Sequence, residues 1–375
     1  MIGCKDFCDW LTEAGVTFLT GVPDSVLKGF CAWLVERAAD RHVLAANEGG
    51  AVALACGHHL ATGELALVYM QNSGQGNAAN PLVSLADPEV YGIPLLLLIG
   101  WRGEPGLHDE PQHVRQGEVT LPLMDSLGIP CRVLEAEPQA AAEQVAELAR
   151  LARARSGPVA LIVRKNTIEA YAPQHPPTGE THPLSREEAL ELVVGTLAEK
   201  DVIVSTTGKL SRELYELRER TGTGHDREFL TIGSMGHASQ IAMGIARSRP
   251  ERQVFCFDGD GALIMHLGAA AIIGGHQVPN LKHVVFNNGC HGSVGGMETV
   301  GFRVSFTEIA RACGYRQALR AMSREEVLDG MARLHDSPGP GMLEIFLRKG
   351  ARPDLGRPKT SPKQNKTAFM EFLSP

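Results

Sequence analysis

Short apolar runs alternate with amphipathic segments along the first half of the chain. Leu65–Met70 and Pro94–Ile99 are almost continuously apolar, which is typical of strands in a parallel sheet that helices cover on both faces. The segment Gln139–Arg155 has apolar residues at helical spacing. Elsewhere in this half the pattern predicts three strands and three helices, the strands at Val16–Thr20, His42–Ala46 and Pro158–Arg164 and the helices at Asp6–Ala14, Lys28–Ala38 and Gly49–His59.

The second half repeats this alternation, although no close sequence repeat is visible. Two Ser-Arg-Glu-Glu sequences, at Ser185 and Ser323, predict helix starts, because the serine and the glutamate three residues later each accept a hydrogen bond from a free backbone N–H group. The other elements predicted are strands at Val202–Ser205, Val254–Phe257, His283–Phe286 and Met342–Leu347 and a helix at Ala262–Ile273. Two arrays of similar size indicate an α/β fold with two domains, each a mostly parallel sheet flanked by helices.

A proline-rich stretch separates the two arrays. Residues 170–183 contain four prolines and no apolar periodicity, which is typical of a linker. We therefore predict a first domain at 1–169, a linker at 170–184, a second domain at 185–350 and a tail at 351–375. The tail is polar and basic up to Ala368–Leu373, and we interpret it as a loose arm that ends in a docking helix.

Composition and charge exclude several classes of protein. Of 375 residues, 43% are apolar and 21% charged, so the chain is globular rather than disordered. The net charge of −7 disfavours a general binder of nucleic acid or anionic membranes, and an anionic ligand needs a local basic pocket. Eight cysteines without a Cys-x-x-Cys pair argue against a zinc ribbon or redox dithiol. We expect a cytoplasmic protein, since no signal-peptide core or membrane-length apolar run occurs.

The most informative motif is the turn Gly259-Asp260-Gly261 at the end of a predicted strand. Twenty-five residues separate it from Asn287-Asn288, and this interval matches one strand–helix–strand unit. The two sequences should therefore occupy neighbouring loops beyond the carboxyl ends of the strands, where open α/β sheets bind ligands. A carboxylate and an amide oxygen suit Mg²⁺, which completes its shell with phosphate oxygens. The glycines let the backbone approach the phosphates closely.

This motif resembles the diphosphate-binding motif of thiamine diphosphate enzymes. The resemblance implies Mg²⁺ ligands at Asp260, Asn288 and the backbone carbonyl of Cys290, a position where the family more often has glycine. It also implies that Met235 supports the bent cofactor and that the Gly233 carbonyl accepts a hydrogen bond from the aminopyrimidine. The cofactor-binding residues expected in this half are Thr206, Thr207, Gly208, Gly233, Ser234, Met235, Gly259, Asp260, Gly261 and Asn288.

Glu48 is the candidate for activating the cofactor. Members of the family need one carboxylic acid in a dry site, where desolvation favours the protonated form, to exchange a proton with the pyrimidine ring. Glu48 follows a predicted strand and opens an Ala-rich helix. In the family the pyrimidine half of one subunit faces the diphosphate half of another. A site that needs both Glu48 and Asp260 therefore implies at least a homodimer with active sites at the subunit interfaces.

Further motifs resemble those of the phosphonopyruvate decarboxylase family, and the third domain of larger relatives is absent. These motifs are Gly21–Val26, Gln71–Asn77, Trp101–Gly106, Asp109–His113, Ser205–Lys209 and His291–Gly296. The resemblance implies decarboxylation of 3-phosphonopyruvate to phosphonoacetaldehyde and CO₂, in phosphonate and antibiotic biosynthesis. Asp24 resembles an acid used in proton transfer, and His113 is its candidate partner. For this small anionic 2-oxo acid, the candidate contacts are Arg102, Arg115, Lys209 and His291.

Three alternatives remain open or are disfavoured. The related sulfopyruvate decarboxylases share this machinery, and no single residue excludes their substrate. A subunit of a ketoacid:ferredoxin oxidoreductase is disfavoured because the sequence has no Cys-x-x-Cys spacing for an iron–sulfur cluster. A non-catalytic regulatory or scaffold subunit would be expected to have lost Glu48 or Asp260, and both are present.

Overall fold

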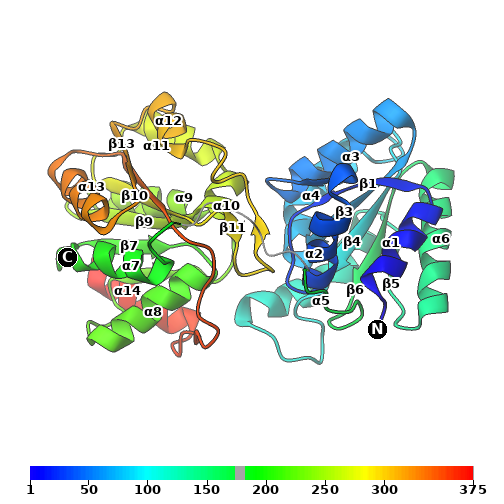
Figure 1. Ribbon diagram of the computed structural model, residues 1–375, viewed down its shortest axis with the longest axis horizontal. Coiled ribbons are helices and arrows are strands. Elements are labelled where there is room, and N and C mark those ends of the chain that lie inside the picture. The colour runs from blue at the N-terminus through cyan, green and yellow to red at the C-terminus, as the bar shows by residue number, and fades with distance from the viewer. Residues whose placement is uncertain (174–181, 375) are drawn as a thin grey trace. The chain divides into compact units, whose positions relative to one another are not determined.

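The chain folds into two compact units. A computed structural model describes residues 1–173 and 182–374, and its internal contacts divide the chain into unit 1, residues 1–177, and unit 2, residues 178–375 (Figure 1). Residues 174–181, which belong to the predicted linker, lie outside the described residues. Each unit is an α/β structure with a parallel six-stranded sheet between helices, which confirms the predicted fold class.

Unit 1 contains strands and helices in alternation. Its elements are α1 (Cys4–Glu13), β1 (Val16–Gly21), α2 (Lys28–Arg37), the 3-10 turn η1 (Ala39–Arg41), β2 (His42–Leu44), α3 (Glu48–Thr62), β3 (Leu65–Gln71), the 3-10 turn η2 (Asn72–Gly74), α4 (Gln75–Ser84), β4 (Leu95–Gly100), α5 (Pro111–Ser126), β5 (Cys131–Val133), α6 (Pro138–Arg155) and β6 (Pro158–Val163).

Side chains alternate across β3, and this alternation decides which helices cover each face of the sheet. Val68 and Met70 lie in one core cluster with residues of α3, α4 and α5. Tyr69 faces the opposite side, where its ring lies 6.3 Å from that of Phe30 on α2, and Phe30 lies 5.5 Å from Phe7 on α1. Because both faces are buried, β3 is apolar at successive positions.

Unit 2 follows with its own array of strands and helices. Its elements are α7 (Arg186–Gly195), β7 (Val202–Ser205), α8 (Lys209–Thr221), β8 (Glu228–Leu230), α9 (Ala238–Ser248), β9 (Val254–Gly259), α10 (Asp260–Met265), α11 (Gly268–His276), β10 (Leu281–Asn287), β11 (Cys290–His291), β12 (Met297–Glu298), α12 (Phe306–Ala312), β13 (Gln317–Ala321), α13 (Arg324–Asp336), β14 (Gly341–Phe346) and α14 (Pro362–Leu373).

The two sheets have the same topology. The strand order is β2-β1-β3-β4-β6-β5 in unit 1 and, read from β8, β8-β7-β9-β10-β14-β13 in unit 2. Numbered within each six-stranded sheet, both orders are 2-1-3-4-6-5, so the fold is duplicated although the sequence is not visibly repeated. In both sheets the order reverses between the first and third strands, which is the position where such sheets bind ligands beyond the carboxyl ends of the strands.

Two core clusters cover the two faces of the unit 2 sheet. Phe255 and Phe257 of β9 pack with residues of α7, α8 and α13, whereas Val254 and Cys256 pack with residues of α9, α11 and α12. The predicted capping boxes are both present, at Ser185 before α7 and Ser323 before α13. The buried cores hold the strands in register, and the capping boxes define where α7 and α13 begin.

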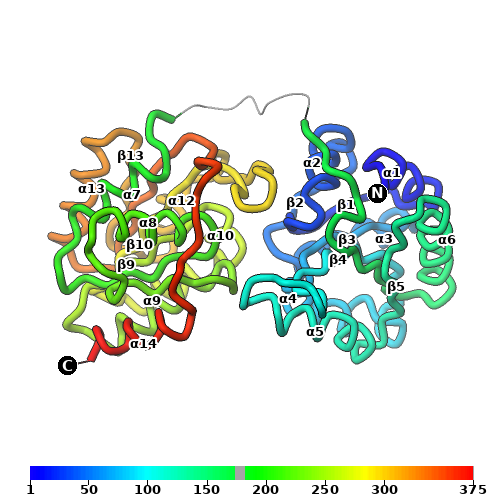
Figure 2. Tube along the Cα trace, turned by 90° about the horizontal axis from the view of Figure 1, so that it is seen from below, coloured from blue at the N-terminus to red at the C-terminus, as the bar shows by residue number. Residues whose placement is uncertain are grey.

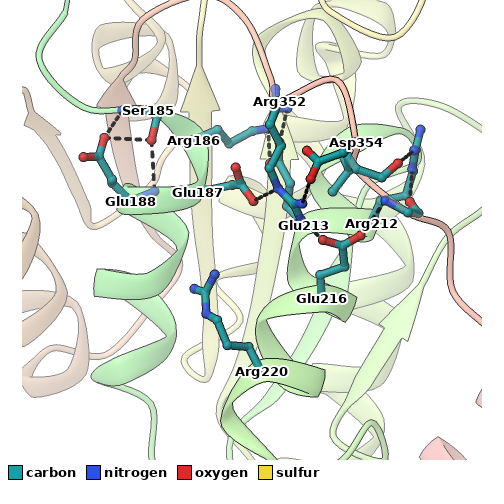
Figure 3. Close-up of polar contacts among 12 residues, drawn as sticks. Ser185, Arg186, Glu187, Glu188, Arg212, Glu213, Glu216, Arg220, Arg352 and Asp354 are labelled. Atoms are coloured by element: carbon teal, nitrogen blue, oxygen red, sulfur yellow. Dashed lines mark hydrogen bonds and ion pairs between the residues drawn. The ribbon is translucent and has the colours of Figure 1, made fainter.

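The C-terminal segment of unit 2 is fixed more firmly than the sequence indicated. Arg352 pairs with Glu187 on α7 at 2.9 Å and contacts Glu216 on α8 (Figure 3). The segment then runs along unit 2 to α14 (Figure 2), whose Phe369 is buried. The expected docking helix is confirmed, whereas the expectation of a loose arm was wrong because ion pairs tie this segment to two helices.

The predicted helix Ala262–Ile273 is two helices, α10 and α11. His266 ends α10 with non-helical dihedral angles (φ −131°, ψ 49°), and its ring lies 4.3 Å from that of His237. Both pieces pack on the same core, so the apolar pattern gives no sign of the break. Helices α4 and α5 were not predicted, because internal prolines obscure their periodicity. Helix α8 was not predicted either, although Leu210, Leu214 and Leu217 recur at helical spacing and are buried. None of the described helices is long and apolar enough to cross a lipid bilayer.

Candidate active site

Parallel register brings the loops after β1, β2 and β3 to one edge of unit 1. Gly21, the last residue of β1, pairs with Leu44, the last residue of β2, and with Tyr69 of β3, which ends two residues later at Gln71. The three loops therefore leave the sheet at the same edge. Asp24 and Glu48 follow β1 and β2 within four residues. The two predicted carboxyl groups of this half therefore lie at the edge where the topology favours ligand binding.

Glu48 is the first residue of α3. Asn47 caps this helix by accepting a hydrogen bond from the Gly50 N–H at 2.8 Å, which fixes where Glu48 begins the helix. Glu48 is 5% exposed, and its Oε2 accepts a hydrogen bond from Asn77 Nδ2 at 2.8 Å. A Cβ atom on Gly74 would lie only 2.5 Å from Glu48 Oε1, so the carboxyl group needs a glycine at that position.

Asp24 is completely buried in the loop after β1. Its Oδ2 accepts hydrogen bonds from the N–H groups of Val26 and Leu27 at 3.0 and 3.1 Å. Its Oδ1 is also buried and has no partner among the described residues. Burial raises the pKa of Asp24 to about 6, although the backbone hydrogen bonds and the charge of Arg102 act in the opposite direction. Asp24 can therefore change protonation near neutral pH, as a general acid or base must.

Arg102 follows β4 and is held by neighbouring residues. It donates hydrogen bonds to Asp109 Oδ2 at 2.8 Å and to Ser25 Oγ at 2.7 Å. Burial alone would raise the pKa of Asp109, but bonds from Arg102 and from the Glu110 and Gly103 N–H groups hold it below its usual value. Arg102 thus joins the loop after β4 to the Asp24 loop. A substrate could therefore bind only those N–H groups of Arg102 that do not already donate to Asp109 or Ser25.

A buried amide network fixes the loop between β3 and α4. Asn72 Nδ2 donates to the Arg102 carbonyl at 2.7 Å and to Thr120 Oγ1 at 2.9 Å, and Gln75 Nε2 donates to the Thr120 carbonyl at 3.1 Å. The two amide donors, Asn72 and Gln75, belong to the sequence motif Gln71–Asn77. This network positions η2 and the first turn of α4, which place Gly74 and Asn77 beside Glu48.

The other two predicted residues of unit 1 lie on α5. His113 is buried in the first turn, where a Cβ atom on Gly103 would come within 1.9 Å of its carbonyl oxygen. Arg115 has a side chain that is 84% exposed and pairs with Glu118 at 2.8 Å. His113 therefore packs close to the Arg102 loop, whereas Arg115 lies on the surface of the unit.

In unit 2 the predicted diphosphate residues lie where the strand order reverses. Thr206, Thr207 and Gly208 follow β7, and Asp260 follows the adjacent strand β9. Thr206 is buried, and its Oγ1 has no hydrogen-bond partner in the part of the chain that the structure describes. The structure thus brings the two predicted loops to neighbouring strand ends. The free hydroxyl can donate to a ligand.

Asp260 and Asn288 are both buried and adjacent. Asp260 Oδ2 accepts a hydrogen bond from Thr299 Oγ1, and Oδ1 accepts one from the Asn288 N–H at 3.4 Å. Asn288 Oδ1 accepts from the Cys290 N–H at 3.2 Å, and the Cys290 carbonyl accepts from the Gly292 N–H at 3.0 Å. The three predicted metal ligands therefore belong to one short turn and the helix start beside it.

This donor set fits a bound divalent cation. Burial raises the pKa of Asp260 to about 6, and the hydrogen bond from Thr299 only partly offsets the effect. No lysine or arginine pairs with Asp260 within residues 1–173 and 182–374, so a cation would stabilise the ionised form. Carboxylate, amide and backbone carbonyl oxygens are the ligands that Mg²⁺ accepts.

Met235, Gly261 and His291 gather at the start of α10. A Cβ atom on Gly261 would lie 2.7 Å from Cε1 of His291 and 3.5 Å from Cε of Met235. Burial lowers the pKa of His291 to about 4, so its ring is neutral at pH 7. Gly233 and Ser234 precede Met235 in the same loop, where Ser234 adopts a left-handed backbone (φ 52°), an unusual conformation for serine.

Family models match both halves of the chain. Residues 1–125 match the N-terminal TPP binding domain of thiamine pyrophosphate enzymes, and residues 207–345 match the C-terminal TPP binding domain. A phosphonopyruvate decarboxylase of Streptomyces viridochromogenes is 34% identical over 100% of this chain and 96% of its own length. The chain belongs to the phosphonopyruvate decarboxylase family of thiamine diphosphate enzymes. It is a thiamine diphosphate-dependent decarboxylase.

Other members of this wider group are also similar. A phosphonopyruvate decarboxylase of Streptomyces hygroscopicus is 34% identical over 100% of this chain and 94% of its own length. A sulfopyruvate decarboxylase of Methanosarcina acetivorans is 27% identical, with 87% of each chain covered. The family expected from the motifs is confirmed, and the thiamine diphosphate cofactor is supported by the matched domains.

Two residues that contact the predicted carboxyl groups were missed in the sequence. Asn77, which binds Glu48, is the last residue of the motif Gln71–Asn77. Its place in that motif could have identified it as a site residue. Thr299 binds Asp260 from 39 residues away in the chain, and no local pattern marks it. Only the turn that brings β12 back to β11 places Thr299 beside Asp260.

Proposed function

We propose that this chain decarboxylates 3-phosphonopyruvate to phosphonoacetaldehyde and CO₂, with thiamine diphosphate and Mg²⁺ as cofactors. The observation that carries the proposal is the similarity, over the whole chain, to two proteins named phosphonopyruvate decarboxylase. The buried carboxyl groups of Glu48 and Asp260 support it, because a decarboxylase of this family requires both. The reaction would serve phosphonate biosynthesis.

Each carboxyl group has a separate role in this proposal. Bound thiamine diphosphate supplies the nucleophilic carbon and the electron sink for loss of CO₂. Glu48 holds a proton for exchange with the pyrimidine ring, and Asn77 fixes its orientation by bonding Oε2. Asp260 and Asn288, with the Cys290 carbonyl, hold Mg²⁺ against the diphosphate. The hydroxyl of Thr206, which has no partner among the described residues, is available to the same diphosphate.

Asp24 is the proposed acid or base for the reacting substrate. Its Oδ2 is held by two backbone N–H groups, which leaves the buried Oδ1 to take or give the proton. The buried His113 is its proposed partner. Lys209 and His291 are the favoured substrate contacts, since Arg102 is paired with Asp109 and Arg115 lies on the surface.

The substrate is tested by parallel assays on the protein loaded with both cofactors. We expect a kcat/KM at least ~10-fold higher for 3-phosphonopyruvate than for sulfopyruvate or pyruvate, with the aldehyde product measured directly. The alternative substrate, sulfopyruvate, is supported by the similarity to the sulfopyruvate decarboxylase of Methanosarcina acetivorans. A higher kcat/KM for sulfopyruvate would overturn the proposed substrate and favour that alternative.

The proposed assembly is a homodimer or larger, with each site formed by unit 1 of one subunit and unit 2 of another. Mixing the variants Glu48→Gln and Asp260→Ala, at a cofactor concentration too low for Asp260→Ala to be active, tests this. Random exchange between two such dimers restores one intact site in each mixed dimer, so activity should recover to about a quarter of the unmodified level. No recovery after confirmed subunit exchange would mean that each chain forms its own site.

A further inference from the structure

Arg186 and Lys209 each begin a helix, where a positive side chain is electrostatically unfavourable. Arg186 is the first residue of α7 and Lys209 the first residue of α8. Helix N-termini already carry partial positive charge, so a cation there raises the electrostatic free energy. The first turn of α7 contains Glu187 and Glu188, whereas that of α8 has no acidic residue and no side-chain cap. Positive charge is therefore concentrated at the start of α8.

Glu213 fixes the guanidinium group of Arg186 beside this helix start. Arg186 donates from Nε and Nη2 to the two carboxylate oxygens of Glu213 at 2.5 and 2.6 Å (Figure 3). The side chains are 9% and 1% exposed. Because Glu213 lies four residues after Lys209, the two share one face of α8. These two hydrogen bonds use Nε and Nη2. Nη1 of Arg186 has no acceptor in the described part of the chain.

This free nitrogen borders the loop that contains the predicted metal ligands. A Cβ atom on Gly292 would lie 3.9 Å from Arg186 Nη1 and 3.8 Å from Asn288 Nδ2. The side chain of Lys209 is half-buried and forms no ion pair within the described ranges. Burial, followed by the charge of Arg186, lowers the pKa of Lys209. Thr206, three residues before Lys209, adds a buried hydroxyl that also lacks a partner there.

Two close cations with only one carboxylate between them are stabilised when an anion binds. We propose that Arg186, Lys209 and the N-terminus of α8 form a binding site for a phosphorus oxyanion, with Glu213 as the positioning residue for Arg186. Arginine and lysine bind such oxygens by charge-assisted hydrogen bonds, and a helix N-terminus adds its free N–H groups. The proposal rests on the proposed function, because the substrate's phosphonate and the cofactor's diphosphate both carry this chemistry.

Binding is tested first without turnover, with methylphosphonate as the probe on the protein loaded with thiamine diphosphate and Mg²⁺. The dissociation constant is measured by phosphorus NMR titration for the unmodified protein, Arg186→Gln and Lys209→Gln. We expect each substitution to weaken methylphosphonate binding at least ~10-fold. This measurement is independent of which 2-oxo acid the enzyme decarboxylates, so it separates failure of the site from failure of the proposed function.

Two further measurements identify which ligand uses the site. If the substrate's phosphonate binds there, both variants raise the KM for 3-phosphonopyruvate at least ~10-fold and do not change the dissociation constant of the cofactor. If the diphosphate binds there instead, it fills the site in the loaded protein, so methylphosphonate binding is the same in all three proteins, the affinity of both variants for the cofactor falls, and the KM of the loaded enzyme is unchanged. Either outcome supports the site and names its occupant.

Arg218→Gln is the matched control. Arg218 also lies on α8 and forms a buried pair with a glutamate, Glu228, at 2.9 Å, so Arg218→Gln reports the structural cost of removing a buried arginine from its glutamate partner. We expect a lower Tm but unchanged methylphosphonate and cofactor binding. The proposal is overturned if Lys209→Gln, folded by circular dichroism, changes no binding constant or KM, or if Arg218→Gln weakens methylphosphonate binding as much as Arg186→Gln does.

Discussion

The third strands of the two sheets, β3 and β9, occupy the same place in the strand order but lead into different loops. After β3 come Asn72 and Ser73, and the loop is locked by amide hydrogen bonds to Thr120. After β9 comes Asp260, a buried carboxyl group whose described partners are neutral groups. The comparison shows that one topology supports two kinds of site, because the loops beyond the strands carry the chemistry and the strands carry the core.

Unit 1 instead places its carboxyl groups after its first and second strands. Asp24 follows β1 and Glu48 follows β2, and both are buried beside small residues or backbone. Among the described residues, neither Asp24 nor Glu48 contacts a second proposed oxygen ligand in the way that Asp260 contacts Asn288. Unit 1 thus carries the groups proposed for proton transfer, whereas unit 2 carries those proposed to hold a cation and phosphates. Substitutions in each unit should separate these two functions.

The largest expected effect is that of Glu48→Gln in unit 1. The amide cannot exchange the proton, so we expect kcat to fall by about 10³-fold, within the range of general acid–base catalysis. Cofactor affinity should stay within ~2-fold, since burial and the contact with Asn77 are retained. Steady-state kinetics and cofactor titration check both values. Glu64→Gln, at an exposed position, is the control, and normal turnover by Glu48→Gln would refute the assigned role.

Asp260→Ala in unit 2 should have the opposite signature. We expect thiamine diphosphate affinity in Mg²⁺ to fall by about 100-fold, with part of the activity restored at high cofactor concentration. Titration with and without Mg²⁺ measures this effect. Asp329→Ala removes a carboxylate that is 69% exposed and serves as control. An unchanged Mg²⁺ dependence in Asp260→Ala would contradict the assignment of the metal site to unit 2.

A smaller effect is expected from Gly74→Ala, which should displace the carboxyl group of Glu48 without replacing the residue. The new Cβ atom would lie 2.5 Å from Glu48 Oε1, so the carboxyl group must move, and we expect kcat to fall by about 10–100-fold. Gly76→Ala lies in the same segment and meets no atom within 4 Å. If both variants lose the same activity, the cause is the loop and not the position of the carboxyl group.

The smallest effect concerns the pH dependence of stability. The pKa of Asp24 is about 6 in the folded chain against an ordinary 3.8, so the folded state binds more protons between these values. Its contribution to the free energy of unfolding therefore falls as pH rises from about 4 to 6. Asp24→Asn keeps an oxygen that can accept from Val26 and Leu27. It should raise the free energy of unfolding at pH 7 by ~1–3 kcal/mol.

Urea unfolding at several pH values from 4 to 7.5 checks this prediction. The exposed Asp9, replaced by Asn, is the control and should leave the pH dependence as it is. If Asp24→Asn shows the same decline in stability as the unmodified protein, the buried carboxyl group of Asp24 is not its source. The variant should also lose decarboxylase activity, which would show that the residue is retained for catalysis at a cost in stability.

The sequence predicted the central strands well and the helices unevenly. β3, β4 and β7 match their predicted ranges to within one residue at each end, because strands buried on both faces are apolar throughout. Helices α4 and α5 contain internal prolines at Pro81 and Pro122 and depend on packing against the sheet. Their sequences alone therefore gave no clear helical signal.

What the sequence alone determined is the class of fold and the family. Apolar runs of strand length and the turn Gly259-Asp260-Gly261 are local features, so they can be identified without a structure. The tertiary structure decided which groups meet: Asn77 with Glu48, Thr299 with Asp260, and Arg186 with Glu213. These contacts join residues that are 27 to 39 positions apart. Only parallel strand pairing and the packing of separate helices bring them within hydrogen-bonding distance.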